Sequence, residues 1–62
     1  MNDIDKTKAT ADYIGKPERT LTQWRYLNVG PPYIKVGPSS VRYRKSDVDA
    51  WLESQTVRPE VA

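Results

Sequence analysis

Three cations stand at alternate positions of two short apolar runs near the middle of the chain: Lys35 in YIKV, and Arg42 and Arg44 in VRYR. Like charges across a two-stranded ribbon repel one another, and the phosphates of a polyanion would relieve that repulsion and release condensed counterions. A charged strand edge that blocks aggregation is the alternative explanation. Phosphate binding is favoured, because the outer side of a neighbouring predicted helix also carries polar and basic side chains.

The chain lacks the side chains on which most catalytic and metal sites are built. It has no cysteine and no histidine, which removes disulfides, thiolate ligands, the commonest metal ligand and the usual general base near neutral pH. Asp47 and Asp49 do not face each other in the first turn of a predicted helix, and they suit the helix dipole better than acid–base catalysis. We therefore expect no enzyme activity, no metal and no cofactor.

The length and the charge distribution limit the class of protein further. A chain of 62 residues forms one domain with a limited core, worth roughly 3–5 kcal/mol net. Its net charge of +2 conceals a segregation: residues 1–15 sum to −1, residues 16–45 to +6 and residues 46–62 to −3. A basic middle segment favours a polyanion partner. With no membrane span and no signal peptide in the sequence, we expect a soluble cytoplasmic protein without a membrane partner.

Two helices are predicted in the first half of the chain, after a flexible N-terminal segment at residues 1–6. Thr7 is expected to cap the first helix, KATADYI, and Gly15 to end it in a left-handed conformation. Pro17 suits the first turn of a second helix, PERTLTQWRYL. Leu21 and Trp24 lie three residues apart on its core side. The opposite side of this helix carries Arg19, Thr22, Gln23 and Tyr26.

A β-hairpin follows, because Gly30 and two prolines prevent the helix from continuing. YIKV and VRYR alternate with period 2 around the turn GPSS. The alternation predicts that one set of side chains faces inward, namely Ile34, Val36, Val41 and Tyr43. The other set is expected to face outward, namely Tyr33, Lys35, Arg42 and Arg44.

A third helix is predicted to begin with a capping box formed by Ser46 and Asp49, and a polar tail covers residues 54–62. The two tryptophans could stack on nucleobases, but their apolar i, i+3 neighbours favour a place in the core. The expected core contains Leu21, Trp24, Ile34, Tyr43, Val48, Trp51 and Leu52. The element order predicts a mainly α fold with a small β-hairpin: a single winged helix-turn-helix domain over residues 7–53.

Two stretches of the chain resemble a known family. TADYIGKPERTLTQWR resembles the opening of the small MerR-like, AlpA-like helix-turn-helix proteins, and VRYRKSDVDAWL resembles the end of their wing and the helix that follows it. The resemblance covers residues 7–53. Members of this family include phage excisionases, also called recombination directionality factors, and small prophage transcriptional regulators.

The resemblance implies a DNA binder with its second helix in the major groove and its wing on the adjacent minor groove. The helix residues carried over by position are Arg19, Thr20, Thr22, Gln23 and Arg25. The wing residues are Lys35, Arg42 and Arg44. Gln23 can pair with adenine and Arg19 with guanine, Thr22 can touch a thymine methyl or a phosphate, and Arg25 suits a phosphate. Further phosphate contacts are expected from Lys16, Tyr26, Tyr33 and Lys45.

This sequence departs from the family pattern at two places. Pro17 stands where many relatives have a serine cap, so that cap bond is lost. Thr22 and Gln23 stand where basic residues are frequent, which weakens the electrostatic contribution of this helix and changes the bases that it could read.

Three functions remain open from the sequence. The favoured one is an excisionase that binds adjacent DNA sites, bends the DNA and directs an integrase of the tyrosine recombinase class toward excision. The chain shows no effector domain and no long dimerisation helix, so no small-molecule effector is expected. We expect the protein to be located in the host-cell cytoplasm or nucleoid. The alternatives are a small prophage-type transcriptional regulator and a basic protein-interaction domain. Protomers are expected to bind cooperatively through Ser54 to Ala62, with Val57 and Val61 exposed.

Overall fold

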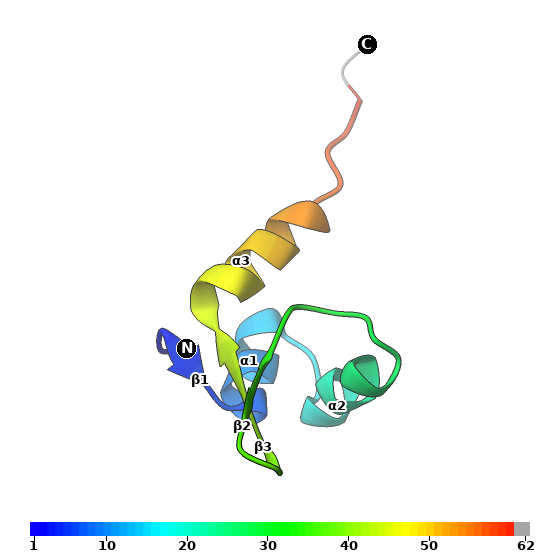
Figure 1. Cartoon of the computed structure of the whole chain (residues 1–62). Coiled ribbons are helices and arrows are strands. Elements are labelled where there is room, and N and C mark those ends of the chain that lie inside the picture. The colour runs from blue at the N-terminus through cyan, green and yellow to red at the C-terminus, as the bar shows by residue number, and fades with distance from the viewer. Residues whose placement is uncertain (61–62) are drawn as a thin grey trace.

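The computed structural model describes residues 1–60 and consists of three helices and three strands (Figure 1). In chain order these are β1 (Ile4–Asp5), α1 (Thr7–Ile14), α2 (Glu18–Tyr26), β2 (Ile34–Val36), β3 (Ser40–Arg44) and α3 (Lys45–Ser54). The strands form one antiparallel sheet in the order β1-β3-β2. The expected winged helix-turn-helix arrangement is confirmed: α1 and α2 form the motif, and the β2–β3 hairpin is the wing.

The turn between α1 and α2 follows from Gly15 and Pro17. Gly15 has φ 88°, in the left-handed region where a side chain is strained, and its N–H donates to the carbonyl of Ala11 at 2.8 Å. Pro17, with φ −63°, directly precedes the first residue of α2, Glu18. The prediction for Gly15 is confirmed, whereas Pro17 lies just outside the helix rather than in its first turn.

The predicted cap of α1 is wrong. Lys6 occupies the N-cap position without a side-chain cap hydrogen bond, and Thr7 is the first helical residue. The hydroxyl of Thr7 instead accepts a hydrogen bond from Arg25 at 3.2 Å. The hydroxyl oxygen of Thr7 therefore bonds Arg25, which is distant in the sequence, instead of capping the backbone N–H groups of α1.

The N-terminal residues are part of the sheet rather than a flexible segment. Ile4 pairs with Arg44 and Asp5 with Tyr43, while the N–H of Lys45 donates to the carbonyl of Asp3 at 2.7 Å. Met1 packs against the core. These contacts satisfy an edge of β3 that would otherwise be open, and they correct the expectation for residues 1–6.

The register of the hairpin differs from the expected one. The turn has three residues, Gly37–Ser39, so Ser40 belongs to β3 and pairs with Val36. Ile34 pairs with Arg42, and Lys35 with Val41. Because directly paired residues point to the same side of a sheet, a shift of one residue moves every side chain of one strand to the other face.

The expected inward face therefore does not exist as predicted. Val41 and Tyr43 share the core side with Lys35, whereas Ile34 and Val36 share the outer side with Arg42 and Arg44. Val36 is 50% exposed.

The core lies where α1, α2, β3 and α3 meet. Its fully buried apolar residues are Ala11, Leu21, Tyr43 and Val48. Partly buried residues packed around them include Met1, Ile14, Trp24, Val41 and Leu52. The ring of Trp51 lies 5.4 Å from that of Trp24, between their centroids. Most of the predicted core residues are thus confirmed, whereas Trp51 is half-buried and lies against Trp24, and the register places Ile34 on the outer side of the sheet.

The loop between α2 and β2 closes over Trp24. Gly30 has φ 87°, and a Cβ atom at this position would lie 2.8 Å from the Cε3 atom of Trp24. Pro31, the next residue, is buried. Gly30 is therefore required both by its backbone conformation and by the close approach of the indole.

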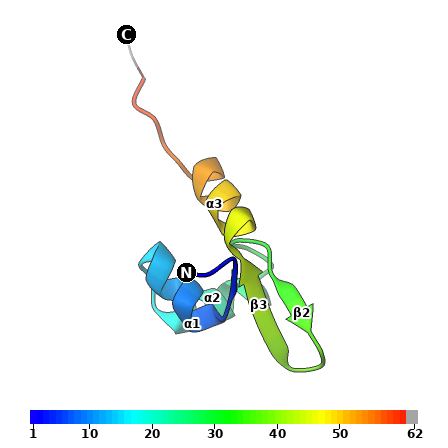
Figure 2. The same ribbon diagram turned by 90° about the vertical axis from the view of Figure 1, so that its left-hand side faces the viewer.

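The helix α3 begins immediately after β3, with Arg44 as its N-cap and no side-chain cap hydrogen bond. The predicted capping box of Ser46 and Asp49 is wrong, because Asp49 binds Tyr13 and Lys45 instead. α3 and the segment after it lead away from the wing and give the molecule extents of 50 × 24 × 17 Å (Figures 1 and 2). Val61 lies outside the described residues. Within residues 1–60, no helix has the length and apolar character needed to cross a membrane.

Candidate nucleic-acid interface

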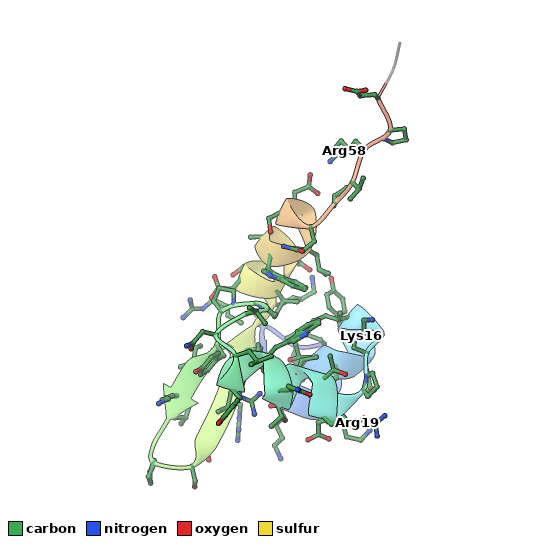
Figure 3. The ribbon with its side chains drawn as sticks, turned by 90° about the vertical axis from the view of Figure 1, so that its right-hand side faces the viewer. Lys16, Arg19 and Arg58 are labelled. Atoms are coloured by element: carbon green, nitrogen blue, oxygen red, sulfur yellow. The ribbon has the colours of Figure 1, made fainter. Side chains whose placement is uncertain are left out.

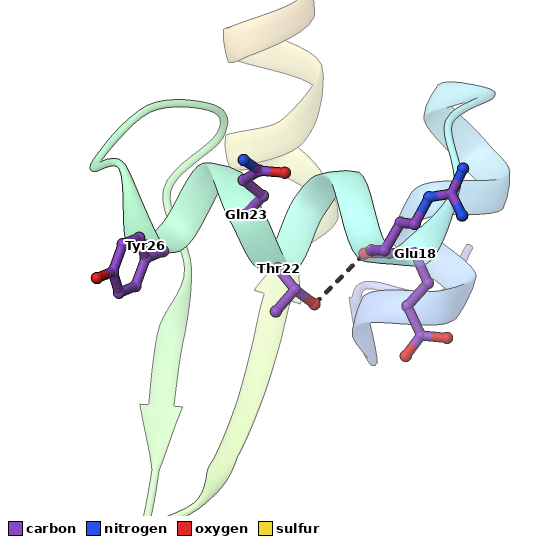
Figure 4. A pocket seen from close by; sticks show the side chains of 5 residues that line it. Glu18, Thr22, Gln23 and Tyr26 are labelled. Atoms are coloured by element: carbon purple, nitrogen blue, oxygen red, sulfur yellow. Dashed lines mark hydrogen bonds between the residues drawn. The ribbon is translucent and has the colours of Figure 1, made fainter.

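The exposed side of α2 forms a shallow hollow, and five side chains from successive turns of the helix line it (Figure 4). They are Glu18, Arg19, Thr22, Gln23 and Tyr26. The helical period of 3.6 residues brings them to one side, opposite the buried Leu21. Tyr26 is 87% exposed, at the end of α2. The outward positions predicted for Arg19, Thr22, Gln23 and Tyr26 are confirmed.

The side chains of Arg19 and Gln23 have no hydrogen-bond or ion-pair partner among residues 1–60. Thr22 makes only a long hydrogen bond, from its hydroxyl to the carbonyl of Glu18 at 3.4 Å (Figure 4). Arginine can bind guanine with two hydrogen bonds, and glutamine can do the same with adenine. This side of α2 can therefore contact base edges without first breaking strong contacts within the protein.

Glu18 is a member of this surface that sequence reasoning missed. Its carboxylate can accept a hydrogen bond from the amino group of cytosine, and it repels phosphates. The available signal was its spacing, four residues before Thr22 on the same side of the helix. Lys16 and Arg19 both lie at the end of α2 farther from the hairpin (Figure 3), and Lys16 is exposed.

Two residues predicted for the major groove do not lie on this surface. Thr20 is half-buried and lies toward the side of Trp24. Arg25 is half-buried as well, and its Nη1 atom donates to the hydroxyl of Tyr43 at 2.8 Å and to that of Thr7 at 3.2 Å. The guanidinium carbon of Arg25 lies 5.8 Å from the ring centroid of Tyr33 and 5.9 Å from that of Tyr43.

Arg25 thus joins three elements: α2, on which it stands, α1 through Thr7 and the wing through Tyr43. A guanidinium that bonds two hydroxyls and lies near two aromatic rings is held firmly in place. The contacts fix the position of the exposed side of α2 relative to the wing. Tyr33, expected to contact phosphate, is 36% exposed and serves in part as a packing partner of Arg25.

The three wing cations do not form one row, which corrects the sequence expectation. Lys35 lies on one face of the ribbon, and Arg42 and Arg44 lie on the other. Arg42 donates to the carbonyl of Val41 at 2.8 Å, and Arg44 pairs with Asp47 at 3.2 Å. The Arg44–Asp47 pair is largely solvent-exposed, so it contributes roughly 0–1 kcal/mol and can be exchanged for a phosphate.

Lys45, expected to contact a phosphate, lies in a contact between α3 and α1. Its Nζ atom pairs with Asp49 at 3.0 Å and lies 5.4 Å from the ring centroid of Tyr13. The hydrogen bond to Asp49 raises the pKa of Lys45. The hydroxyl of Tyr13 donates to Asp49 at 2.6 Å and, together with Lys45, lowers the pKa of Asp49. A phosphate contact by Lys45 would compete with this arrangement.

Comparison with known proteins agrees with the arrangement of the elements. A model of a helix-turn-helix domain family matches residues 6–56, which include α1, α2, the wing and α3. A search of curated proteins found no match to the chain. Since the family match spans most of the 62 residues, the chain belongs to this helix-turn-helix domain family, whose members bind DNA with sequence specificity.

Proposed function

We propose that this protein is an excisionase that inserts α2 into the major groove of double-stranded DNA and places its wing on the adjacent minor groove. The main support for this DNA-binding geometry is the exposed side of α2, where the side chains of Arg19 and Gln23 have no partner among residues 1–60. The helix that carries them is held in place by the hydrogen bond of Arg25 to Tyr43. In this proposal Gln23 and Arg19 read base edges, while Thr22 contacts a thymine methyl or a phosphate. The protein binds and deforms DNA and catalyses no reaction.

The wing is proposed to supply charge from both of its faces. Lys35 on one face, and Arg42 and Arg44 on the other, can reach the phosphates of the two strands that border a minor groove. This arrangement replaces the single row predicted from the sequence, and it suits a ribbon that enters a groove better than one that lies flat on a strand. Lys16 and Tyr26, both exposed, are proposed as further phosphate contacts at the two ends of α2.

The excisionase function rests on the small size of the interface. One short helix and one wing contact about 600–1,000 Å² of DNA, by comparison with other single modules, which is little for selective binding in a genome. Cooperative binding at adjacent sites would supply the missing selectivity, and head-to-tail contacts would let several protomers add their bends along the duplex. We propose that residues 54–60 contribute to this contact, because Val57 is 91% exposed. The integrase whose reaction is redirected would be a tyrosine recombinase.

The experiment has two parts. Binding sites are first selected from a random duplex pool, and titrations then follow occupancy and bending on DNA with one site or with three adjacent sites. A monomer in sedimentation without DNA, cooperative filling of three sites and a bend that grows with occupancy are expected. Excision by the integrase from the same genome should then depend on the protein. Independent site filling on straight DNA would instead favour the small transcriptional regulator, and absence of duplex binding would favour a protein-interaction domain.

A further inference from the structure

A second hollow lies between the start of α1, one side of α2 and the wing. Its lining includes Lys6 and Lys8 at the start of α1, Arg25 of α2 and Arg42 of β3. Four cations thus surround one hollow, and the only carboxylate in its lining is that of Glu18. Neither Lys6 nor Lys8 was predicted as a site residue.

The positive charge of this hollow is poorly neutralised within the protein. Lys6, Arg25 and Arg42 form no ion pair among residues 1–60. Lys8 pairs with Asp12 at 3.6 Å, but both side chains are more than 70% exposed, so water screens the pair. Arg25 is half-buried, and its partners are neutral hydroxyls and aromatic rings. A partly desolvated cation without an opposite charge gains from a bound anion.

Hydroxyl groups complete the lining on two sides. Thr7 accepts a hydrogen bond from Arg25, which leaves its own proton free to be donated. Ser39 and Ser40 lie on the wing side of the hollow, and neither hydroxyl has a partner among residues 1–60. Arginine, lysine and hydroxyl donors that converge in this way match the acceptor oxygens of a phosphate.

The place of the hollow agrees with the geometry of a duplex. A sugar–phosphate backbone always separates a major groove from the adjacent minor groove, so a protein with a helix in one and a wing in the other must straddle that backbone. The hollow lies between these two elements. Glu18 lines both this hollow and the exposed side of α2, and it stands at the boundary between the phosphate side and the base-reading side.

We propose that this hollow binds one phosphate of the DNA strand that passes between α2 and the wing, held by Lys6, Arg25 and Arg42. This inference rests on the proposed DNA-binding function and assigns to it a contact point that also fixes how far α2 enters the groove. Arg25 then has two functions, because it ties α2 to the wing through one nitrogen and presents its remaining N–H groups to the phosphate.

The test compares Lys6→Gln with Arg58→Gln in the full chain. Both residues are exposed, and both substitutions remove one positive charge, but Arg58 lies on the segment after α3, remote from the wing (Figure 3). The affinity for a mixed-sequence 20-base-pair duplex is measured between 50 and 200 mM salt. Lys6→Gln is expected to lower the salt slope by about 0.9, so that the affinity lost across this range is roughly 3.5-fold smaller than for the wild type. Arg58→Gln should leave the slope unchanged.

Equal slopes for the two variants would overturn the phosphate site while leaving DNA binding intact. A wild-type protein that binds no duplex would reject the proposed function itself, and with it this site. A titration of the free protein with inorganic phosphate distinguishes the source of the anion. Shifts of the Thr7 and Ser40 amide resonances that occur without any change in the duplex slope of Lys6→Gln would assign the hollow to free phosphate and contradict the proposal.

Discussion

The exposed side of α2 and the wing carry polar side chains under different internal constraints. On α2, Arg19 and Gln23 have no partners among residues 1–60, and the helical period alone brings them to one side. On the wing, Arg42 donates to a carbonyl and Arg44 pairs with a carboxylate, and the faces on which they stand depend on strand register. Side chains without internal partners can discriminate among bases, whereas tethered cations mainly supply charge. Under the proposed function, this difference favours sequence reading by α2 and groove affinity from the wing.

Loss of the packing that holds α2, the proposed base-reading helix, should produce the largest effect. Trp24→Ala removes an indole that contacts Trp51 and packs under the loop at Gly30, and it should cost about 3–5 kcal/mol. A domain of this size has a net stability of roughly 3–5 kcal/mol, so the variant should be largely unfolded at 25 °C. Thermal unfolding followed by circular dichroism measures this.

Tyr26→Ala is the matched control, since its aromatic side chain stands on the same helix but is 87% exposed. It should change the stability by less than about 0.5 kcal/mol. Wild-type melting of the Trp24 variant would show that this indole does not hold α2 in place.

A direct contrast between the two regions comes from Gln23→Ala and Arg44→Gln. Gln23→Ala should cost about 1–3 kcal/mol of binding free energy on the selected site and leave random duplexes unaffected. Arg44→Gln should weaken both kinds of duplex equally and lower the salt slope by about one phosphate contact. Fluorescence anisotropy titrations on both duplexes measure these losses. Equal weakening of both duplexes by Gln23→Ala would exclude base reading by this residue.

Tyr43→Phe can loosen the link between the two regions without changing the exposed side of α2. Tyr43 is 1% exposed, and Tyr43→Phe removes only the hydroxyl that Arg25 binds at 2.8 Å. A hydrogen bond with a charged donor of this kind should contribute about 1–2 kcal/mol to the free energy of unfolding.

Urea unfolding of Tyr43→Phe, Arg25→Met and the double variant forms a mutant cycle for this bond. The double variant should be less destabilised than the two single losses added together. Strict additivity would mean that the contact between Arg25 and Tyr43 does not contribute to stability.

The smallest effect concerns pH and lies outside both regions. Hydrogen bonds from Tyr13 and Lys45 lower the pKa of Asp49 in the folded protein. The contribution of this carboxylate is therefore fully present above its unfolded pKa of about 3.9 and is lost as the pH falls through the lower folded value. The Tm of Asp49→Asn should lie slightly below that of the wild type at pH 7, and the difference should shrink at pH 3. A difference of the same size at both pH values would contradict the pKa argument.

The helices were predictable from local patterns in the sequence. Gly15 ends α1 because of its own conformational freedom, and the exposure of Arg19, Thr22 and Gln23 follows from the period of α2. Such features depend on residues only a few positions apart. The wing was predictable as a hairpin, but its faces were not, because a turn of three residues instead of four moves one strand by a single position.

Features that depend on distant partners were not predictable. β1 has only two residues, too few to show a period, and it forms because β3 offers an open edge. In the sequence, nothing distinguishes Arg25 from a DNA-contacting basic residue of a recognition helix. Its guanidinium is nevertheless positioned by Thr7 and Tyr43, each 18 positions away. The candidate function of Lys6 and Lys8 depends on the position of the start of α1 beside the wing, which the sequence alone does not show.

The contact between Trp24 and Trp51 gives the protein a built-in optical signal. These are the only two tryptophans in the chain, and their rings lie 5.4 Å apart at an interplanar angle of 51°. At such a separation the electronic transitions of the two indoles couple, so near-ultraviolet ellipticity and tryptophan emission both depend on the contact between α2 and α3. Unlabelled protein can therefore be followed in rapid-mixing experiments, where a change in indole emission would report a change in the contact between α2 and α3.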